Sequence, residues 1–128
     1  MLSITYENKH SIRIVRISGD LTSDNIRSIR NDFVIEDNND HHYIFDLQDL
    51  VQIDSTGLSY IINCLKKVMK NNLELKLLNL RNQPRIIFEI TRVDSLFELY
   101  ENEKEALKSF IQKERYNESN NTTVGQSA

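Results

Sequence analysis

The stretch from Asp46 to Leu58 constrains the fold of this chain more than any other part of the sequence. It begins at the end of an apolar segment, residues 42–47, whose composition is that of a strand covered on both faces. It then leads through a turn into a helix-like segment that opens on DSTG, residues 54–57. The first N–H groups of a helix lack intrahelical partners, so a Ser, Thr or Asp side chain caps them or an anion binds there. A hydroxyl group here is therefore either a plain cap or a candidate phosphate acceptor.

The segment after this turn has the clearest helical periodicity in the chain. Its apolar residues form one stripe at three- and four-residue spacing, and polar residues fall on the opposite side. Asn71 and Asn72 end the pattern. The predicted apolar stripe consists of Leu58, Ile61, Ile62, Leu65, Val68 and Met69. The predicted polar side consists of Asn63, Lys66, Lys67 and Lys70. We interpret the lysines as a solvated face, with docking on an acidic partner as the alternative.

Alternating patterns predict further strands, and apolar residues at helical spacing predict further helices. The order β-β-α-β-α-β-α-β-α predicts an α/β fold, in which helices pack against a mixed sheet. The predicted strands cover residues 2–6, 12–17, 42–47, 73–78 and 97–100. The predicted helices cover residues 23–33, 55–70, 84–90 and 103–114. The apolar residues of the first are Ile26, Ile29 and Phe33, and the third has Pro84 in its first turn and apolar Ile86, Ile87 and Ile90. In the last, Ala106, Leu107, Phe110 and Ile111 are expected to face inward.

Length and composition exclude several classes of protein. A chain of 128 residues suits one domain, and its net charge of −3 provides no basic field for nucleic acid. The single cysteine, Cys64, cannot form an internal disulfide, no signal peptide is evident, and no window approaches the ~18 apolar residues of a membrane span. We expect a soluble cytoplasmic domain at residues 1–116 that binds no membrane. Residues 117–128 hold one sizeable aliphatic residue, Val124, and are predicted to form a disordered polar tail.

The sequence DSTGL at residues 54–58 resembles the Asp-Ser-Ser/Thr-Gly-Leu motif in the STAS domain of bacterial anti-sigma factor antagonists, which carries the phosphorylated serine. SGDL at residues 18–21 resembles the Gly-Asp/Glu-Leu turn of that family. Residues 85–88 and 93–97 resemble its third helix and last strand. The resemblance covers about residues 1 to 112 in order. It implies a STAS-like mixed sheet of about four to five strands with about four helices packed against it.

The resemblance also implies a function for this chain. The unphosphorylated protein would bind a Ser/Thr kinase of the histidine-kinase-like ATPase type, the anti-sigma factor, and phosphorylation of Ser55 would release it. Thr56 is the alternative acceptor, and a metal-dependent Ser/Thr phosphatase would reverse the modification. The residues expected to contact the partner are Asp20, Thr22, Asp54, Ser55, Thr56, Gly57 and Leu58.

Thr22 departs from the family pattern. It stands where many members carry a second acidic residue, and this departure, with the long polar tail, favours a second hypothesis. In that hypothesis the chain is a STAS scaffold or regulatory domain that binds a partner constitutively, without a phospho-switch. Asp20 could equally be a solvated turn residue. Gly57 would either let a partner approach closely or relieve crowding in the first helical turn.

Enzymatic activity and a metal site are not expected. A serine nucleophile needs a base, usually His, and the only histidines are predicted in loops or at a strand start. The chain lacks a GxSxG elbow and a nucleotide-binding GxxxxGK[ST] loop. His41 and His42 lie near Asp37 and Asp40, but adjacent strand residues point to opposite faces, which is poor geometry for one metal ion. Cys64 is interpreted as a small core residue, so no catalytic residue and no cofactor is assigned.

Overall fold

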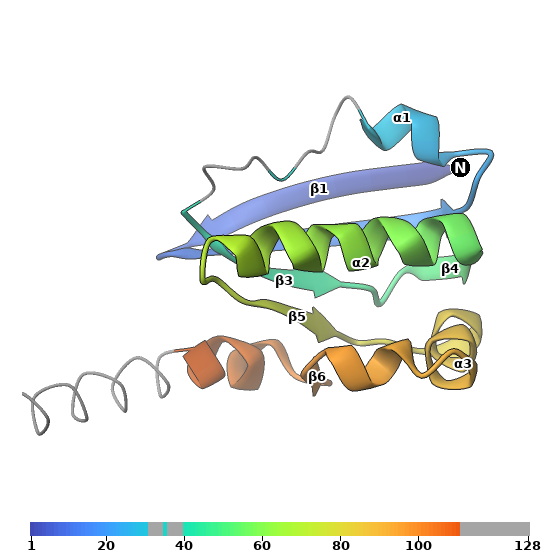
Figure 1. Cartoon of the computed structure of the whole chain (residues 1–128). Coiled ribbons are helices and arrows are strands. Elements are labelled where there is room, and N and C mark those ends of the chain that lie inside the picture. Colours follow the sequence, from blue (N-terminus) through green and yellow to red (C-terminus); the bar gives the residue numbers. More distant parts are fainter. Residues whose placement is uncertain (31–34, 36–39, 111–128) are drawn as a thin grey trace, which may run out of the picture.

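A mixed β-sheet lies at the centre of the computed structural model (Figure 1). The structure describes residues 1–30, 35 and 40–110. Phe33, the predicted end of the last helix and the predicted tail at 117–128 lie outside the described residues. The elements are β1 (Leu2–Lys9), β2 (Ile12–Leu21), α1 (Ile26–Arg30), β3 (His42–Asp46), β4 (Leu50–Ile53), α2 (Ser55–Lys70), β5 (Leu75–Leu78), α3 (Asn82–Ile90), the 3₁₀ helix η1 (Val93–Leu96) and β6 (Leu99–Tyr100), followed by helical residues 103–110.

The long strand β2 organises the sheet. β1 pairs with it antiparallel along the whole length of β1, as a hairpin. On its other edge, β3 pairs parallel with the first half of β2 and β4 pairs parallel with its end, beyond an irregularity between Gly19 and Asp20. β5 and β6 continue the sheet from β3, both in parallel pairing. β2 and β4 therefore end side by side, which creates the edge at which α2 begins.

The sheet separates two hydrophobic cores, because successive side chains of a strand point to opposite faces. The larger core joins Val15 and Phe45 of the sheet to Ile61 of α2, which lies across the front of the sheet in Figure 1. The smaller core joins Ile44 to Phe110 in the C-terminal helical residues. Helices thus cover both faces, as expected for strands with near-continuous apolar sequences.

The predicted fold class and element order are confirmed, but the sheet has one strand more than predicted. β4 occupies residues 50–53, which the sequence analysis assigned to a turn. Leu50 and Ile53 are buried, whereas Val51 and Gln52 are exposed. A four-residue strand with this pattern shows no period of two, so periodicity could not detect it.

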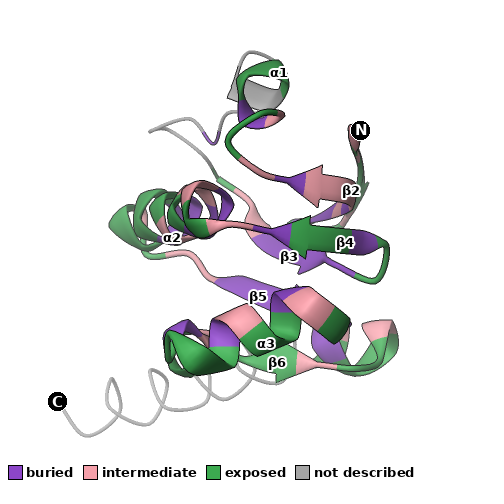
Figure 2. Cartoon of the chain, turned by 90° about the vertical axis from the view of Figure 1, so that its right-hand side faces the viewer, coloured by how far each residue is buried: buried purple, intermediate pink, exposed green. Residues whose placement is uncertain are grey.

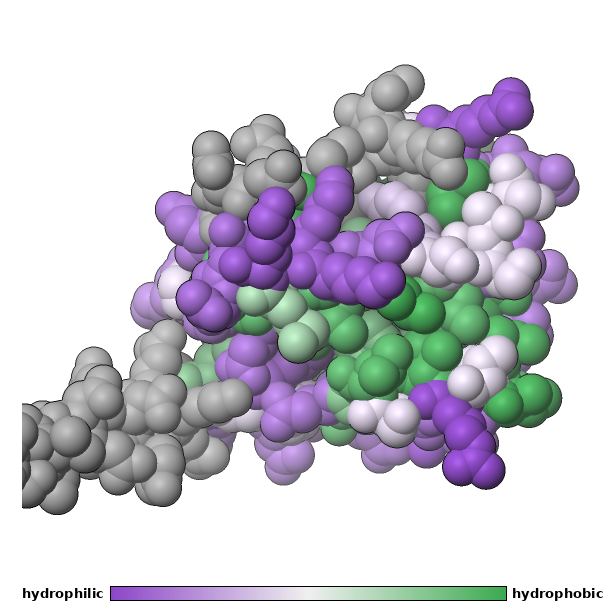
Figure 3. Space-filling model, viewed as in Figure 1, coloured by the Kyte–Doolittle hydropathy of each residue, from purple (hydrophilic) through white to green (hydrophobic). Residues whose placement is uncertain are grey.

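Some apolar residues are placed differently from the prediction. Met69, assigned to the buried stripe of α2, is 60% exposed. In α3 the buried side chains are Pro84 and Phe88, whereas Ile86 and Ile90 are exposed. Figure 3 shows hydrophobic surface across the region of α2 and α3. The helices were therefore predicted correctly, but the side chains that face the core were predicted only in part.

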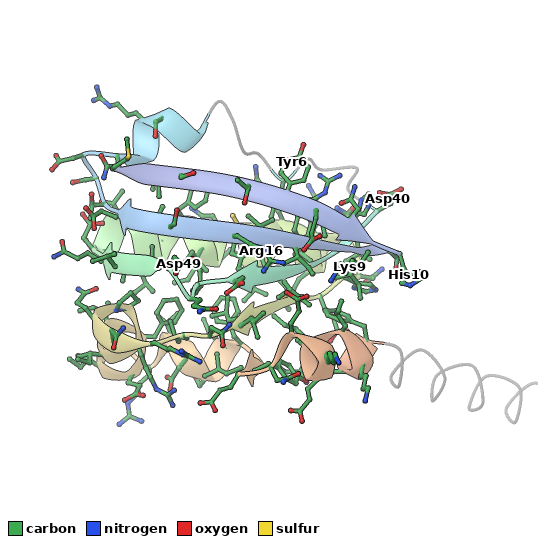
Figure 4. All side chains as sticks on the ribbon, turned by 180° about the vertical axis from the view of Figure 1, so that it is seen from behind. Tyr6, Lys9, His10, Arg16, Asp40 and Asp49 are labelled. Atoms are coloured by element: carbon green, nitrogen blue, oxygen red, sulfur yellow. The ribbon has the colours of Figure 1, made fainter. Side chains whose placement is uncertain are left out.

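Charged side chains link the C-terminal helical residues to the sheet. Lys76 on β5 is only 2% exposed, and its Nζ lies 3.0 Å from Glu98 Oε2 and 2.7 Å from Ser109 Oγ. Arg16 lies on the face of β2 seen from behind in Figure 4, and its Nη2 is 3.1 Å from Glu103 Oε1. A buried ammonium group needs such partners, because an unpaired charge in the interior is costly.

Candidate functional site

The candidate site lies where two parallel strands end and α2 begins, at the end of the molecule that faces the viewer in Figure 2. Leu21 of β2 pairs with Ile53 of β4, and the N–H of Asp54 donates to the carbonyl of Leu21 at 3.4 Å. This pairing brings the turn after Gly19 beside the turn that precedes α2. The two segments singled out in the sequence, residues 18–22 and 54–58, are therefore neighbours in space.

Asp54 is the N-cap of α2. Its backbone is extended, with φ −112° and ψ −174°, and its Oδ1 accepts the N–H of Gly57 at 2.9 Å. Its second carboxylate oxygen accepts the N–H of Ser23 at 2.8 Å. One side chain thus satisfies a helix N–H and joins α2 to the turn after β2. The alternative in which Ser55 is the cap was wrong, because Asp54 precedes it and provides the acceptor.

These hydrogen bonds also favour the ionised form of Asp54. The N–H groups of Gly57 and Ser23 hold the pKa of its carboxyl group below the ordinary value. A carboxylate that accepts backbone N–H bonds is stabilised in its ionised form. Asp54 therefore carries a negative charge at neutral pH, directly beside Ser55.

Ser55 and Thr56 open α2 and differ in exposure. Ser55 is the first residue of the helix and is exposed, whereas Thr56 is half-buried. Because Asp54 already caps the helix, the hydroxyl group of Ser55 is not needed for capping. The exposed hydroxyl is therefore the better placed of the two to enter the active site of another protein.

Gly57 allows α2 to pack directly on the end of β2. A Cβ atom at this position would lie 2.0 Å from the carbonyl oxygen of Leu21 and 2.9 Å from Cγ1 of Ile53. Leu58 is also buried, 7% exposed, within the larger core. Gly57 and Leu58 thus pack beneath the turn. Any side chain larger than that of glycine at position 57 would collide with the end of β2. The predicted contact of these two residues with a partner stays a prediction.

The second segment forms the other half of the site. Gly19 has φ +90°, and a Cβ there would lie 1.9 Å from the carbonyl oxygen of Met1, so this position also requires glycine. Asp20 follows it, with its side chain 36% exposed and Oδ2 3.8 Å from the N-terminal amino group. The carbonyl of Thr22 accepts the N–H groups of Asn25 and Ile26, which forms the turn into α1.

One residue of the site was missed in the sequence analysis. Gln83, in the first turn of α3, accepts the N–H of Ile53 at 2.9 Å and donates to its carbonyl oxygen at 3.1 Å. Nothing in the local sequence indicates this pair, because a glutamine in a first helical turn is ordinarily solvated. Only the proximity of α3 to β4 reveals it.

The histidines lie away from this site. His10 lies in the turn between β1 and β2, and His42 begins β3, so both are at the opposite end of the parallel strands. His42 Nδ1 accepts the N–H of Glu74 at 3.1 Å, and His41 Nδ1 lies 2.8 Å from Asp40 Oδ1. The two adjacent histidines thus contact different partners. No described histidine is placed to act as a base for Ser55.

Comparisons with known proteins agree with the fold and with the predicted family. The STAS domain family model matches residues 3–106, and the chain belongs to this family. The anti-sigma F factor antagonist of Paenibacillus polymyxa is 28% identical over 109 residues, which cover 83% of this chain and 92% of that protein. The predicted resemblance to the anti-sigma factor antagonists is thereby confirmed.

Two solved structures are similar in fold. An anti-sigma factor antagonist from Mycobacterium paratuberculosis has a TM-score of 0.74 at 19% identity, over 85% of this chain and 93% of that chain. The phosphorylated form of the Bacillus cell fate determinant SpoIIAA has a TM-score of 0.66 at 17% identity, over 84% of this chain and 99% of that chain. At these identities the likeness shows the fold alone. Within the residues that the structure describes, no helix is both long and apolar enough to cross a membrane.

Proposed function

We propose that this protein is a phospho-switched interaction module, an anti-sigma factor antagonist. Its unphosphorylated form binds a Ser/Thr kinase of the histidine-kinase-like ATPase type in the cytoplasm, and phosphorylation of Ser55 releases it. A metal-dependent Ser/Thr phosphatase restores the binding form. The observation that carries the proposal is the exposed hydroxyl of Ser55, which follows a cap already provided by Asp54. This chain contributes the acceptor hydroxyl, and the nucleotide belongs to the kinase.

The electrostatics of the turn support a switch in which charge controls binding. A phosphoserine adds about −1.5 to −2 charges at neutral pH. The start of α2 tolerates an anion because of the helix dipole, so the fold is retained. Asp54 is already ionised beside it, so phosphorylation concentrates negative charge on a partner-facing turn. An interface formed around the neutral hydroxyl would then have to desolvate this charge, and like-charge contacts cost several kcal/mol.

The partner surface is proposed to include both neighbouring turns. Asp20 and Thr22 contribute from the end of β2, and Asp54, Ser55 and Thr56 contribute from the start of α2. Gly57 and Leu58 support the surface from beneath. Thr22 provides a hydroxyl at the position where the resemblance implies an acidic residue in many family members, so the kinase that recognises this chain is expected to tolerate a less acidic turn.

Intact-mass analysis of protein recovered from its native cells tests the modification. A fraction that is heavier by one phosphate, mapped to Ser55, is expected. Phosphate mapped to Thr56 would transfer the acceptor role to that residue. Complete absence of phosphate under all growth conditions would favour the constitutive scaffold.

Titration of two variants against the cognate kinase tests the switch. Ser55→Ala should bind like the wild type but accept no phosphate, whereas Ser55→Asp should bind at least ~10-fold more weakly because of the added charge. Ser59→Asp, one helical turn further on and also exposed, is the matched control. If Ser55→Asp binds as tightly as the wild type and ATP leaves the wild-type complex intact, the scaffold hypothesis replaces the switch.

A further inference from the structure

At the outer edge of the strand that precedes the acceptor turn, the side chain of Gln83 forms hydrogen bonds with the backbone. Among the described strands, β4 pairs with β2 alone, so its outer edge has no strand partner. At that edge the N–H of Ile53 donates to Gln83 Oε1 at 2.9 Å, and Gln83 Nε2 donates to the carbonyl of Ile53 at 3.1 Å. A primary amide carries one acceptor and donors, as a peptide group does. Gln83 therefore takes the place of one residue of a neighbouring strand.

The helix that carries Gln83 is itself firmly anchored. Pro84 is buried, and Phe88 is fully buried in the larger core with its ring centroid 6.1 Å from that of Phe97. The hydrogen bonds between Gln83 and Ile53 thus connect a packed helix to the end of β4. Ile53 precedes Asp54 and Ser55 directly, so its position sets where α2 begins.

We propose that Gln83 is a positioning residue for phosphoryl transfer to Ser55. It holds the backbone at Ile53 so that the Ser55 hydroxyl is presented in one orientation to the active site of the kinase. This inference rests on the proposed function, and it adds a residue outside the acceptor motif. Small displacements of an attacking group reduce the rate of a bound complex strongly, by as much as about 100-fold for 1 Å.

A positioning role and a merely structural role predict different kinetics. If loss of the amide only lowered the folded fraction of the protein, fewer molecules could bind, so the apparent KM would rise and kcat would stay unchanged. If the amide orients the acceptor turn, the complex still forms but reacts slowly. In that case kcat falls and KM changes little.

The test uses the full chain and the kinase that phosphorylates it. Gln83→Met keeps the length of the side chain but removes both hydrogen bonds, and Gln83→Glu keeps only an acceptor for the N–H of Ile53. Arg85→Met is the matched control, because Arg85 lies on the same helix and, among the described residues, forms its ion pairs with exposed Glu89 and Glu101. We expect kcat to fall about tenfold for Gln83→Met, at least as much for Gln83→Glu because its second carboxylate oxygen would face the carbonyl oxygen of Ile53, and not at all for Arg85→Met, with KM within twofold throughout.

Amide hydrogen exchange provides a second measurement that needs no kinase. Exchange at Ile53 should accelerate at least about tenfold in Gln83→Met, with β3 and β5 unchanged, because the edge N–H loses its acceptor. Wild-type kcat in Gln83→Met, an increase in KM alone, or an equal loss in Arg85→Met would each overturn the proposal while leaving the proposed function standing. If the wild type accepts no phosphate at all, the proposed function fails and the positioning role fails with it.

Discussion

Asp54 and Ser55 are adjacent at the start of α2, but the structure gives them different roles. The carboxylate of Asp54 accepts hydrogen bonds from the N–H of Gly57 in α2 and from the N–H of Ser23 in the turn after β2. Ser55 is exposed, and we propose it as the residue that is modified. Asp54 is therefore expected to affect the stability of the turn, and Ser55 its proposed phosphorylation. Substitutions at the two positions should have distinct effects.

The two residues can be distinguished by their effects on stability. Ser55→Ala should change the free energy of unfolding by no more than about 0.5 kcal/mol, as at a surface position, because its hydroxyl is not the cap. Asp54→Ala should cost about 0.5–2 kcal/mol, because it removes the N-cap. Urea unfolding of both variants measures the difference. A larger loss for Ser55→Ala than for Asp54→Ala would mean that the serine is the cap after all.

The lowered pKa of Asp54 predicts a specific dependence on pH. Because the folded-state pKa lies below the unfolded value near 3.8, ionised Asp54 stabilises the fold fully above that value. This stabilisation is lost as the pH falls through the folded-state pKa. Asp54→Asn should therefore destabilise the protein at pH 7, and the difference from the wild type should shrink as the pH falls below about 3.8. Unfolding curves at a series of pH values test this, and a constant difference would contradict it.

At the scale of elements, α2 is organised by one buried side. Leu65 is 9% exposed and packs in the larger core, whereas Lys66 next to it is exposed. Cys64 is also buried, as predicted, and burial raises the pKa of its thiol to about 12. The helix thus presents a packed inner side to the sheet and a lysine-bearing outer side to solvent.

A pair of neighbouring substitutions tests this placement. Leu65→Ala should lower the free energy of unfolding by about 2–5 kcal/mol, through lost burial and the cavity left behind. Lys66→Ala, one position further, should have no more than a small effect, about 0.5 kcal/mol or less. Denaturant unfolding of both variants is the measurement. Equal losses would show that α2 is rotated relative to this description.

At the scale of the whole molecule, the two faces of the sheet are covered unequally. α2 covers the larger core, whereas residues 103–110 cover part of the other face and are tied to it by Lys76 and Arg16. The family model ends at residue 106, within these helical residues. We propose that the domain continues to residue 116 and that the polar segment behind it does not contribute to folding.

Truncation tests that boundary. A chain that ends before Asn117 should keep its free energy of unfolding within about 1 kcal/mol, because the removed segment has almost no apolar surface to bury. Thermal unfolding of the full-length and truncated chains provides the comparison. A marked decrease in melting temperature would show that the tail packs on the domain and that the boundary is drawn too early.

The sequence by itself determined the parts of this protein that depend on local pattern. The period of α2, the apolar strands β2, β3 and β5, and the order of the elements follow from residues that are close together in the chain. The hydroxyl-bearing turn was located in the same way, because caps and their helices are adjacent in sequence.

Only the tertiary structure decided which side chains meet. DSTG contains three possible caps in a row; Asp54 caps α2, and it also accepts the N–H of Ser23, which lies about thirty residues earlier in the chain. The pair between Gln83 and Ile53, the burial of Lys76 and the pairing of β4 likewise join segments that are distant in the chain. Such contacts cannot be predicted from local sequence, because a polar side chain is expected to be solvated unless the fold brings a hydrogen-bond partner close to it.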